Sequence, residues 1–267
     1  MSKLGWIGLG AIGTPMALRL LDAGHELHVW GRTSSRLQPA LDRGARAAAS
    51  AAELAATCEA VLLCVTDTEA VETVALGPHG LAEGAKPGLL VIDHSTADPA
   101  RTRALAERVK RDHAIAWLDA PVSGGAPGAR AGTLSIFVGG DEADVERARP
   151  WLAAYGQRIT HLGAAGMGQA AKSCNQAIFG TTIAVWLEVL DYARAIGLDA
   201  PQLVAALEGS WSDSPVRKHL VPHFARARTL GDRGLLHKDL DIVADTARAH
   251  DIELPLTTLA AARLRKG

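Results

Sequence analysis

Residues 4–17 read LGWIGLGAIGTPMA, a short apolar run followed by a glycine-rich turn and a helical pattern. Gly8, Gly10 and Gly13 make the pattern GxGxxG where this pattern is expected, between a predicted strand and a predicted helix. Gly8 permits a tight turn, Gly10 lets a pyrophosphate approach the backbone, and Gly13 allows the helix to pack closely on the strand. The stretch therefore predicts a turn that binds dinucleotide phosphates at a helix N-terminus, and a glycine turn without a ligand is the alternative. The residues between the glycines are Leu9, Ala11 and Ile12.

Short apolar runs continue to alternate with helical stretches up to about residue 160, at 27–30, 61–65, 89–92, 115–118 and 135–138. This alternation predicts parallel strands joined by helical crossovers. Beyond Gly163 the apolar spacing becomes helical, with one long helix expected over 168–196 and shorter ones at 201–208, 236–250 and 257–265. We therefore expect an α/β Rossmann-like domain over 1–162 and an all-α domain, built on the long helix, over 163–267.

The composition indicates an ordinary globular protein, with 48 % hydrophobic residues, 21 % charged residues and a net charge of -1. This balance predicts no nucleic-acid or membrane surface, and no apolar run reaches the ~20 residues of a membrane span. The first apolar run leads directly from Leu4 into the glycine turn, so we expect no signal peptide and a cytoplasmic location. Three cysteines without a CxxC pair and histidines without a nearby acidic cluster predict no metal site.

The end of the second predicted strand favours NADP(H) over NAD(H). An NAD enzyme usually carries Asp or Glu about 20 residues beyond the turn, to bind the ribose hydroxyls. Here the chain reads Gly31-Arg32-Thr33, with Arg36 one turn later. Arg32 can form a forked ion pair with a 2′-phosphate, and no carboxylate is present to repel it. In the alternative, Arg32 is solvated and either cofactor is accepted.

Two further stretches carry groups suited to a small acid substrate. Residues 119–125 read DAPVSGG, and Ser123 with the amides of Gly124 and Gly125 can form an anion-binding nest for a carboxylate. Residues 166–176 read GMGQAAKSCNQ and place Lys172, Asn175 and Gln176 on one helix face, at i, i+3 and i+4. A lysine with two amides on the same helix face is unusual for packing, but suits a lysine that must be held in place.

These stretches, together with DHSTADP at 93–99 and KDLDI at 238–242, resemble the β-hydroxyacid dehydrogenases, the family of 3-hydroxyisobutyrate dehydrogenase and tartronate semialdehyde reductase. They occur in the family's order across nearly the whole chain. The resemblance implies hydride transfer between a nicotinamide cofactor and a small hydroxyacid or semialdehyde acid. It also implies a homodimer or homotetramer, in agreement with the long helix, which is apolar on most sides.

The resemblance also implies roles for single residues. Lys172 matches the family's general acid and base, and Asn175 its helix amide, while Gln176 stands where many members have a second Asn. Ser123, Gly124 and Gly125 match the loop that binds the substrate carboxylate. The expected cofactor contacts further along the chain are Val65, Thr66, Thr96 near the nicotinamide ribose, and Lys238, which closes over the cofactor and substrate.

For Lys172 to exchange a proton near neutral pH, partial desolvation must lower the pKa of its amine. A lysine exposed on the helix surface would remain too basic, and this is the structural alternative. Trp211 either lines the substrate pocket or is a structural aromatic. An imine reductase of the same fold is the nearest enzymatic alternative, although such enzymes usually carry Asp or Tyr in place of Lys172. A non-catalytic NADPH-binding protein is the other.

Overall fold

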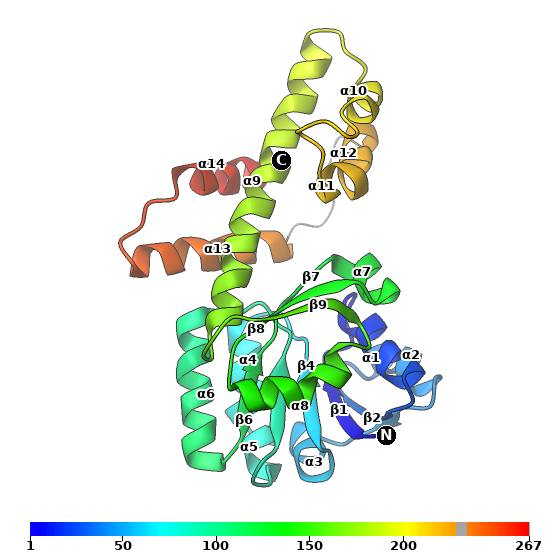
Figure 1. Cartoon of the computed structure of the whole chain (residues 1–267), viewed down its shortest axis with the longest axis vertical. Helices are drawn as coiled ribbons and strands as arrows, with labels where there is room; N and C mark the ends of the chain where they lie inside the picture. Colours follow the sequence, from blue (N-terminus) through cyan, green and yellow to red (C-terminus); the bar gives the residue numbers. More distant parts are fainter. Residues whose placement is uncertain (228–233, 267) are drawn as a thin grey trace. The chain divides into compact units, whose positions relative to one another are not determined.

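The computed structural model describes residues 1–227 and 234–266. Its first part contains a six-stranded sheet in the order β3-β2-β1-β4-β5-β6, in which each strand runs parallel to its neighbours (Figure 1). The strands are β1 (Lys3–Ile7), β2 (Glu26–Trp30), β3 (Arg46–Ala47), β4 (Ala60–Leu63), β5 (Leu90–Asp93) and β6 (Ala116–Asp119). This strand order is that of a dinucleotide-binding Rossmann sheet, so the predicted fold class is confirmed.

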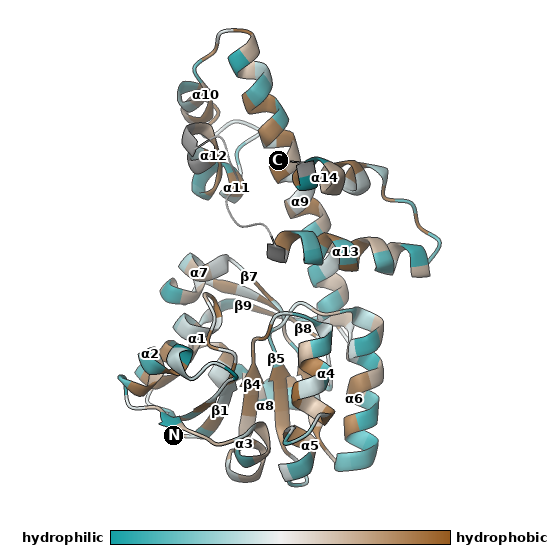
Figure 2. Cartoon of the chain, turned by 180° about the vertical axis from the view of Figure 1, so that it is seen from behind, coloured by the Kyte–Doolittle hydropathy of each residue, from teal (hydrophilic) through white to brown (hydrophobic). Residues whose placement is uncertain are grey.

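Helices cover both faces of this sheet. Successive residues along each strand point to opposite faces, so they pack in two separate apolar clusters, one on each face. In β4, Leu62 packs in one cluster, whereas Val61 and Leu63 pack in the other. The strands are therefore apolar on both sides, as the brown colour of β4 and β5 shows in Figure 2. The helices of this part are α1 (Gly13–Asp22), η1 (Ser34–Leu37), α2 (Gln38–Leu41), α3 (Ala51–Thr57), α4 (Thr68–Leu76), α5 (Leu81–Gly84), α6 (Pro99–His113), α7 (Gly125–Ala131) and α8 (Glu142–Leu152).

A second sheet follows β6 and was not predicted. It contains β7 (Val122–Ser123), β8 (Leu134–Val138) and β9 (Gly156–His161), with β7 antiparallel and β9 parallel to β8. The expected strand at 135–138 therefore does not extend the parallel sheet. The short connection between β7 and β8, which contains the 7-residue helix α7, favours antiparallel pairing of these two strands, and an antiparallel bridge joins Asp119 at the end of β6 to Gly139 after β8.

The rest of the described chain is helical, as predicted, and begins with the 29-residue helix α9 (Met167–Ala195). The short helices α11 and α12 were not expected. α9 buries Ile183, Trp186 and Leu190 in a helical core and leaves Ile178 and Val185 exposed. The other helices are α10 (Ala200–Ala206), α11 (Pro215–His219), α12 (Val221–Ala227), α13 (Gly234–Ala249) and α14 (Pro255–Lys266).

The chain divides into two compact units, Met1–Lys172 and Ser173–Gly267. The division falls within α9, later in the chain than the boundary that we predict at Leu162, because the first turn of α9 is bonded to the sheet of the first unit. In the parts of the chain that the structure describes, no helix has both the length and the apolar character needed to cross a membrane.

Candidate active site

The strand register brings the predicted cofactor residues to one edge of the parallel sheet. Ile7 at the end of β1 pairs with Trp30 of β2 and with Leu63 of β4, and Leu63 in turn pairs with Asp93 of β5. The segments that leave these strand ends therefore start side by side. They contain Gly8, Gly31, Val65, Thr66 and Thr96, all of which are predicted cofactor contacts from separate stretches of the sequence.

The glycines of the first turn differ in what requires them. A Cβ atom on Gly8 would lie 2.2 Å from the Cys64 carbonyl oxygen, and one on Gly13 would lie 2.1 Å from the Gly8 carbonyl oxygen. Both glycines are therefore required by the packing of the chain itself. A Cβ on Gly10 would meet no atom of the described chain within 4 Å. The space beside Gly10 is thus open, as binding of a pyrophosphate requires.

Within the described residues, the N-terminus of α1 has no side-chain cap, unlike four other helices of the first unit; η1, α2, α5 and α7 also lack one, but each has seven residues or fewer. Side-chain oxygens cap α3, α4, α6 and α8, whereas α1, as the structure describes it, has neither a side-chain cap at Ile12 nor an acidic residue in its first turn. Its partial positive charge is therefore available to an anion. The capping residues of the other four helices are Ser50, Asp67, Asp98 and Asp141.

The segment after β2 presents its polar side chains to solvent. Arg32, Thr33 and Arg36 are all exposed, and Arg32 follows Gly31 directly at the strand end. An exposed guanidinium at this place can approach a phosphate without first breaking a buried ion pair.

The predicted lysine and the predicted carboxylate loop lie together in the first unit. The Lys172 side chain is only 7 % exposed, and its Nζ donates a hydrogen bond of 2.8 Å to the carbonyl oxygen of Val122. The next residue, Ser123, is half-buried and leads to Gly124 and Gly125, whose φ angles are 127° and 60°. Positive φ at two successive residues is a backbone conformation that favours glycine. Lys172 is thus buried, and its amine bonds to Val122, the residue immediately before Ser123 of this loop.

Asp119 at the end of β6 binds the start of α9. Its Oδ1 accepts from the Gly166 backbone N–H at 2.7 Å, and its Oδ2 accepts from the Gln169 backbone N–H at 2.8 Å. Burial raises the pKa of Asp119, although these hydrogen bonds act in the opposite direction. The side chain of Gln169 is also buried, and it bonds to the backbone on both sides of Thr96.

In the second unit, a row of polar contacts joins α9 to α13. The Asn175 amide donates to Gln176 Oε1 at 2.9 Å, and the Gln176 amide donates to Asp239 Oδ2 at 2.5 Å. Asp239 is buried and forms an ion pair of 3.0 Å with Lys238. Because a carboxylate only accepts hydrogen bonds, Asp239 sets the orientation of the Gln176 amide, which in turn orients Asn175.

A buried aromatic cluster lies beside the glycine turn. His94 Nδ1 bonds the Ala120 carbonyl oxygen at 2.7 Å, so this nitrogen carries the proton, and Nε2 accepts from the Tyr155 hydroxyl at 2.8 Å. Burial lowers the pKa of His94 to about 4. Trp6 stacks on His94 and donates its indole N–H to the Gly8 carbonyl oxygen, and the cluster thereby contacts the turn.

Comparison with known proteins places this geometry in one family. A family model of the NAD-binding domain of 6-phosphogluconate dehydrogenase matches residues 3–163, and one described as "NAD-binding of NADP-dependent 3-hydroxyisobutyrate dehydrogenase" matches residues 166–267. The 2-hydroxy-3-oxopropionate reductase of Escherichia coli is 38 % identical, over 96 % of this chain and 87 % of the relative. The chain belongs to the β-hydroxyacid dehydrogenase family.

Two other members of the β-hydroxyacid dehydrogenase family agree with this assignment. The NAD-dependent L-serine dehydrogenase of Pseudomonas aeruginosa is 33 % identical, over 97 % of this chain and 90 % of the relative. The structure of 3-hydroxyisobutyrate dehydrogenase from Mycobacterium tuberculosis with L-serine superposes with a TM-score of 0.86 at 32 % identity, covering 100 % of this chain and 93 % of the other. The chain is accordingly an oxidoreductase with a nicotinamide-binding domain.

Sequence reasoning did not assign roles to three polar residues of this dehydrogenase: Asp119, Gln169 and Asp239. Each lies within a motif that was recognised, close to a residue that was predicted. What could have identified them in the sequence is a polar side chain at a position that the helix or strand spacing predicts to be buried. The partners that explain the burial are distant in sequence, so the motif alone does not reveal their contacts.

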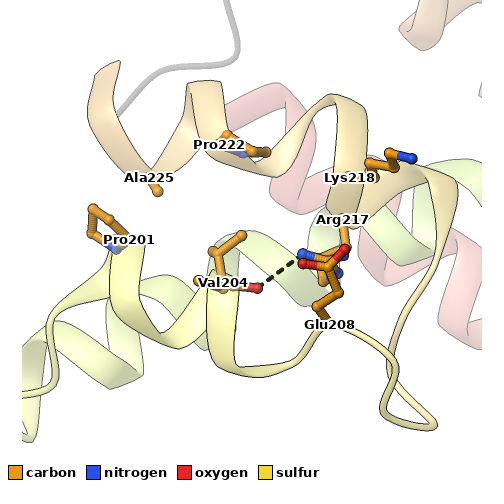
Figure 3. A pocket seen from close by; sticks show the side chains of 8 residues that line it. Pro201, Val204, Glu208, Arg217, Lys218, Pro222 and Ala225 are labelled. Atoms are coloured by element: carbon orange, nitrogen blue, oxygen red, sulfur yellow. Dashed lines mark hydrogen bonds and ion pairs between the residues drawn. The ribbon is translucent and has the colours of Figure 1, made fainter.

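Two further features of the second unit involve Trp211 and a pocket among its short helices. Trp211 is fully exposed and is not among the residues that line the pocket between α10, α11 and α12. A pocket of about 330 Å³ lies between α10, α11 and α12, where the buried Arg217 donates to the Val204 carbonyl oxygen (Figure 3). None of the residues predicted for the site is among those that line it. Over residues 1–227 and 234–266, no group of three or more His, Cys, Asp or Glu is placed to hold a metal ion.

Proposed function

We propose that this chain is an NADP(H)-dependent dehydrogenase of small β-hydroxyacids or semialdehyde acids, in which Lys172 is the general acid and base. The observation that carries the proposal is the position of the Lys172 amine, buried and bonded to Val122 at 2.8 Å, next to the Ser123–Gly125 loop. This arrangement supports binding of a substrate carboxylate and transfer of a proton within one short segment.

In the proposed mechanism, Ser123 and the amides of Gly124 and Gly125 hold the substrate carboxylate. The Lys172 amine, positioned by the Val122 carbonyl, gives a proton to the substrate carbonyl oxygen during reduction and removes it from the hydroxyl during oxidation. A nicotinamide cofactor, when bound, would supply or accept the hydride. Asn175 and Gln176, on the same helix face as Lys172, contribute amide hydrogen bonds to the substrate, and Trp211 remains a proposed pocket residue.

The residues at the sheet edge fit NADP(H). The space beside Gly10 and the uncapped N-terminus of α1 suit the pyrophosphate, and the exposed Arg32 suits a 2′-phosphate. One matched family model is described as NADP-dependent and one relative as NAD-dependent, so the preference rests on Arg32 and the absence of an acid beside it. The further proposed contacts are Leu9, Ala11, Ile12, Gly31, Thr33, Arg36, Val65, Thr66, Thr96 and Lys238.

The names of the relatives favour a small substrate, since they include a 2-hydroxy-3-oxopropionate reductase and an L-serine dehydrogenase. We also propose a homodimer or homotetramer. Ile178, Val185 and Tyr192 recur at seven-residue spacing on α9 and are 71 %, 52 % and 65 % exposed, which is the pattern of a helix face that a second subunit covers.

A substrate panel tests the proposal. The purified chain is assayed with small hydroxyacids and either NADP⁺ or NAD⁺, and with semialdehyde acids or a cyclic imine and NADPH. We expect turnover of at least one hydroxyacid and its semialdehyde, with a higher kcat/KM for NADP(H) than for NAD(H). Turnover of the imine alone would contradict the assignment, and NADPH binding without any turnover would indicate a binding protein.

A further inference from the structure

Gln169 forms hydrogen bonds to the backbone on both sides of Thr96. Its side chain is 1 % exposed. Its Nε2 donates to the Ser95 carbonyl oxygen at 2.8 Å, and its Oε1 accepts from the Ala97 N–H at 3.1 Å. The Ser95 hydroxyl in turn accepts from the Val65 N–H at 3.0 Å. One amide side chain therefore contacts the segment that follows β5 and, through Ser95, the segment that follows β4.

Gln169 also lies next to the proposed proton-transfer group. It precedes Lys172 by three residues on α9, so the two side chains are about one helical turn apart, at ~1.5 Å of rise per residue. Its backbone N–H donates to Asp119 Oδ2 at 2.8 Å, which holds this turn of α9 against the end of β6. The segment around Thr96 is thus bonded directly to the helical turn that precedes Lys172.

We propose that Gln169 is a positioning residue, which fixes the cofactor-side segment Ser95–Ala97 relative to the Lys172 amine. The inference rests on the proposed function, in which Thr96 faces the nicotinamide ribose and Lys172 moves the proton. Hydride and proton must then be transferred to adjacent substrate atoms, and a displacement of about 1 Å between donor groups can reduce the rate about 100-fold.

The two backbone partners determine which side chain can act here. The Ser95 carbonyl only accepts a hydrogen bond and the Ala97 N–H only donates one, so the side chain between them must both donate and accept. A glutamine amide does both. An ionised carboxylate of the same shape can bond Ala97 but repels the Ser95 carbonyl, whereas a protonated carboxyl group satisfies both partners again.

In the Gln169→Glu variant, the hydrogen bond to the Ser95 carbonyl therefore forms only when the introduced carboxyl group is protonated, so the activity should depend on pH. The titratable groups around this position are Asp119 on β6, Asp93 at the end of β5, His94 beside Ser95, and Lys172 on α9. Burial and the two carboxylates favour the protonated form of the introduced group, while Lys172 opposes it. We expect the introduced carboxyl group to titrate above the ordinary range of a glutamate.

The experiment compares wild type, Gln169→Glu, Gln169→Met and the surface control Gln202→Glu from pH 5.5 to 9, with the best hydroxyacid from the panel. We expect kcat of Gln169→Glu to be about 100-fold below wild type at pH 9 and to recover at least tenfold relative to wild type by pH 5.5. Gln169→Met should have a low kcat at every pH, and Gln202→Glu should match wild type. The Kd for NADPH should change less than about threefold in all variants.

A readout without turnover accompanies these assays. Exchange of the Ala97 amide hydrogen, measured by NMR in the cofactor-free chain, should be at least tenfold faster in Gln169→Met than in wild type, with the melting temperature showing that the variant is folded. A folded Gln169→Met with kcat within threefold of wild type, a Gln169→Glu to wild-type ratio that does not change with pH, or unchanged Ala97 exchange would each overturn the inference. Inactivity of the wild type on every acid would instead overturn the proposed function, and this is established before any variant is measured.

Discussion

Two helix N-termini at the same edge of the parallel sheet differ in whether a side chain accepts hydrogen bonds from their backbone N–H groups. At the start of α1 the described chain provides no capping side chain, and the space beside Gly10 is open. At the start of α9 the carboxylate of Asp119 already accepts from two backbone N–H groups. The comparison distinguishes a helix start that is available to a ligand anion from one that uses a protein carboxylate to fix the helix carrying Lys172.

The largest loss of activity is expected at Lys172, because the capped start of α9 holds the helix that carries this amine. Lys172→Ala should lower kcat by about 100- to 10,000-fold, the usual contribution of a general acid or base. Its Kd for NADPH should stay unchanged, as measured by fluorescence titration. Lys218→Ala on the exposed surface of α11 is the control, and substantial activity in Lys172→Ala would refute the proposed role.

Removal of the cap tests the α9 side of the comparison directly. Asp119→Ala leaves the N–H groups of Gly166 and Gln169 buried without an acceptor, which should lower the free energy of unfolding by about 4 kcal/mol. Asp141→Ala removes an exposed cap from α8 and should cost about 1 kcal/mol. Urea denaturation measures the free energy of unfolding of both variants. Equal losses would mean that the buried cap stabilises the fold no more than the exposed one.

The two glycines of the α1 turn separate folding from binding. Gly13→Ala places a Cβ against the Gly8 carbonyl oxygen and should reduce stability by about 3 kcal/mol. Gly10→Ala should leave the melting temperature unchanged and raise the Kd for NADPH at least about tenfold. Thermal melts and binding titrations on both variants check this. If Gly10→Ala binds NADPH normally, the open space beside Gly10 is not the phosphate site.

The buried cluster beside the α1 turn makes stability depend on pH. Because the folded pKa of His94 is about 4 and its ordinary value is 6.5, the unfolded chain binds more protons between these values. The stabilisation is therefore present above pH 6.5 and is lost as the pH falls to about 4, by up to about 3 kcal/mol. Urea denaturation across this window should show a smaller slope for His94→Gln, whereas the exposed His250→Gln should follow wild type.

The smallest effect is expected at Arg32, which is exposed and partly screened by solvent. Arg32→Gln should raise the Kd for NADPH about tenfold and leave that for NADH within about twofold. Arg108→Gln on the surface of α6 should change neither. Isothermal titration with both cofactors measures the ratio, and an equal loss for NADPH and NADH would show that Arg32 does not recognise the 2′-phosphate.

Local sequence patterns were sufficient to predict much of this molecule. The period of the apolar residues predicted α9 and the strands of the parallel sheet to within a few residues, except the two-residue strand β3, which was missed, and the glycine spacing predicted the turn after β1. Helical spacing placed Lys172, Asn175 and Gln176 on one face. The run at 135–138 predicted β8, but the second sheet that β8 forms was not predicted, because β7 has only two residues and its antiparallel pairing depends on the short connection through α7.

What the sequence determined by itself is therefore the set of groups available for chemistry: a glycine turn, an arginine in place of an acid, a carboxylate loop and a lysine. Only the tertiary structure decided which buried polar groups hold them in place. Asp119 and Gln169 bond to partners far away in the sequence, and such pairs have no local period or spacing. Their cause is that a buried donor or acceptor must find a partner wherever the fold brings one within reach.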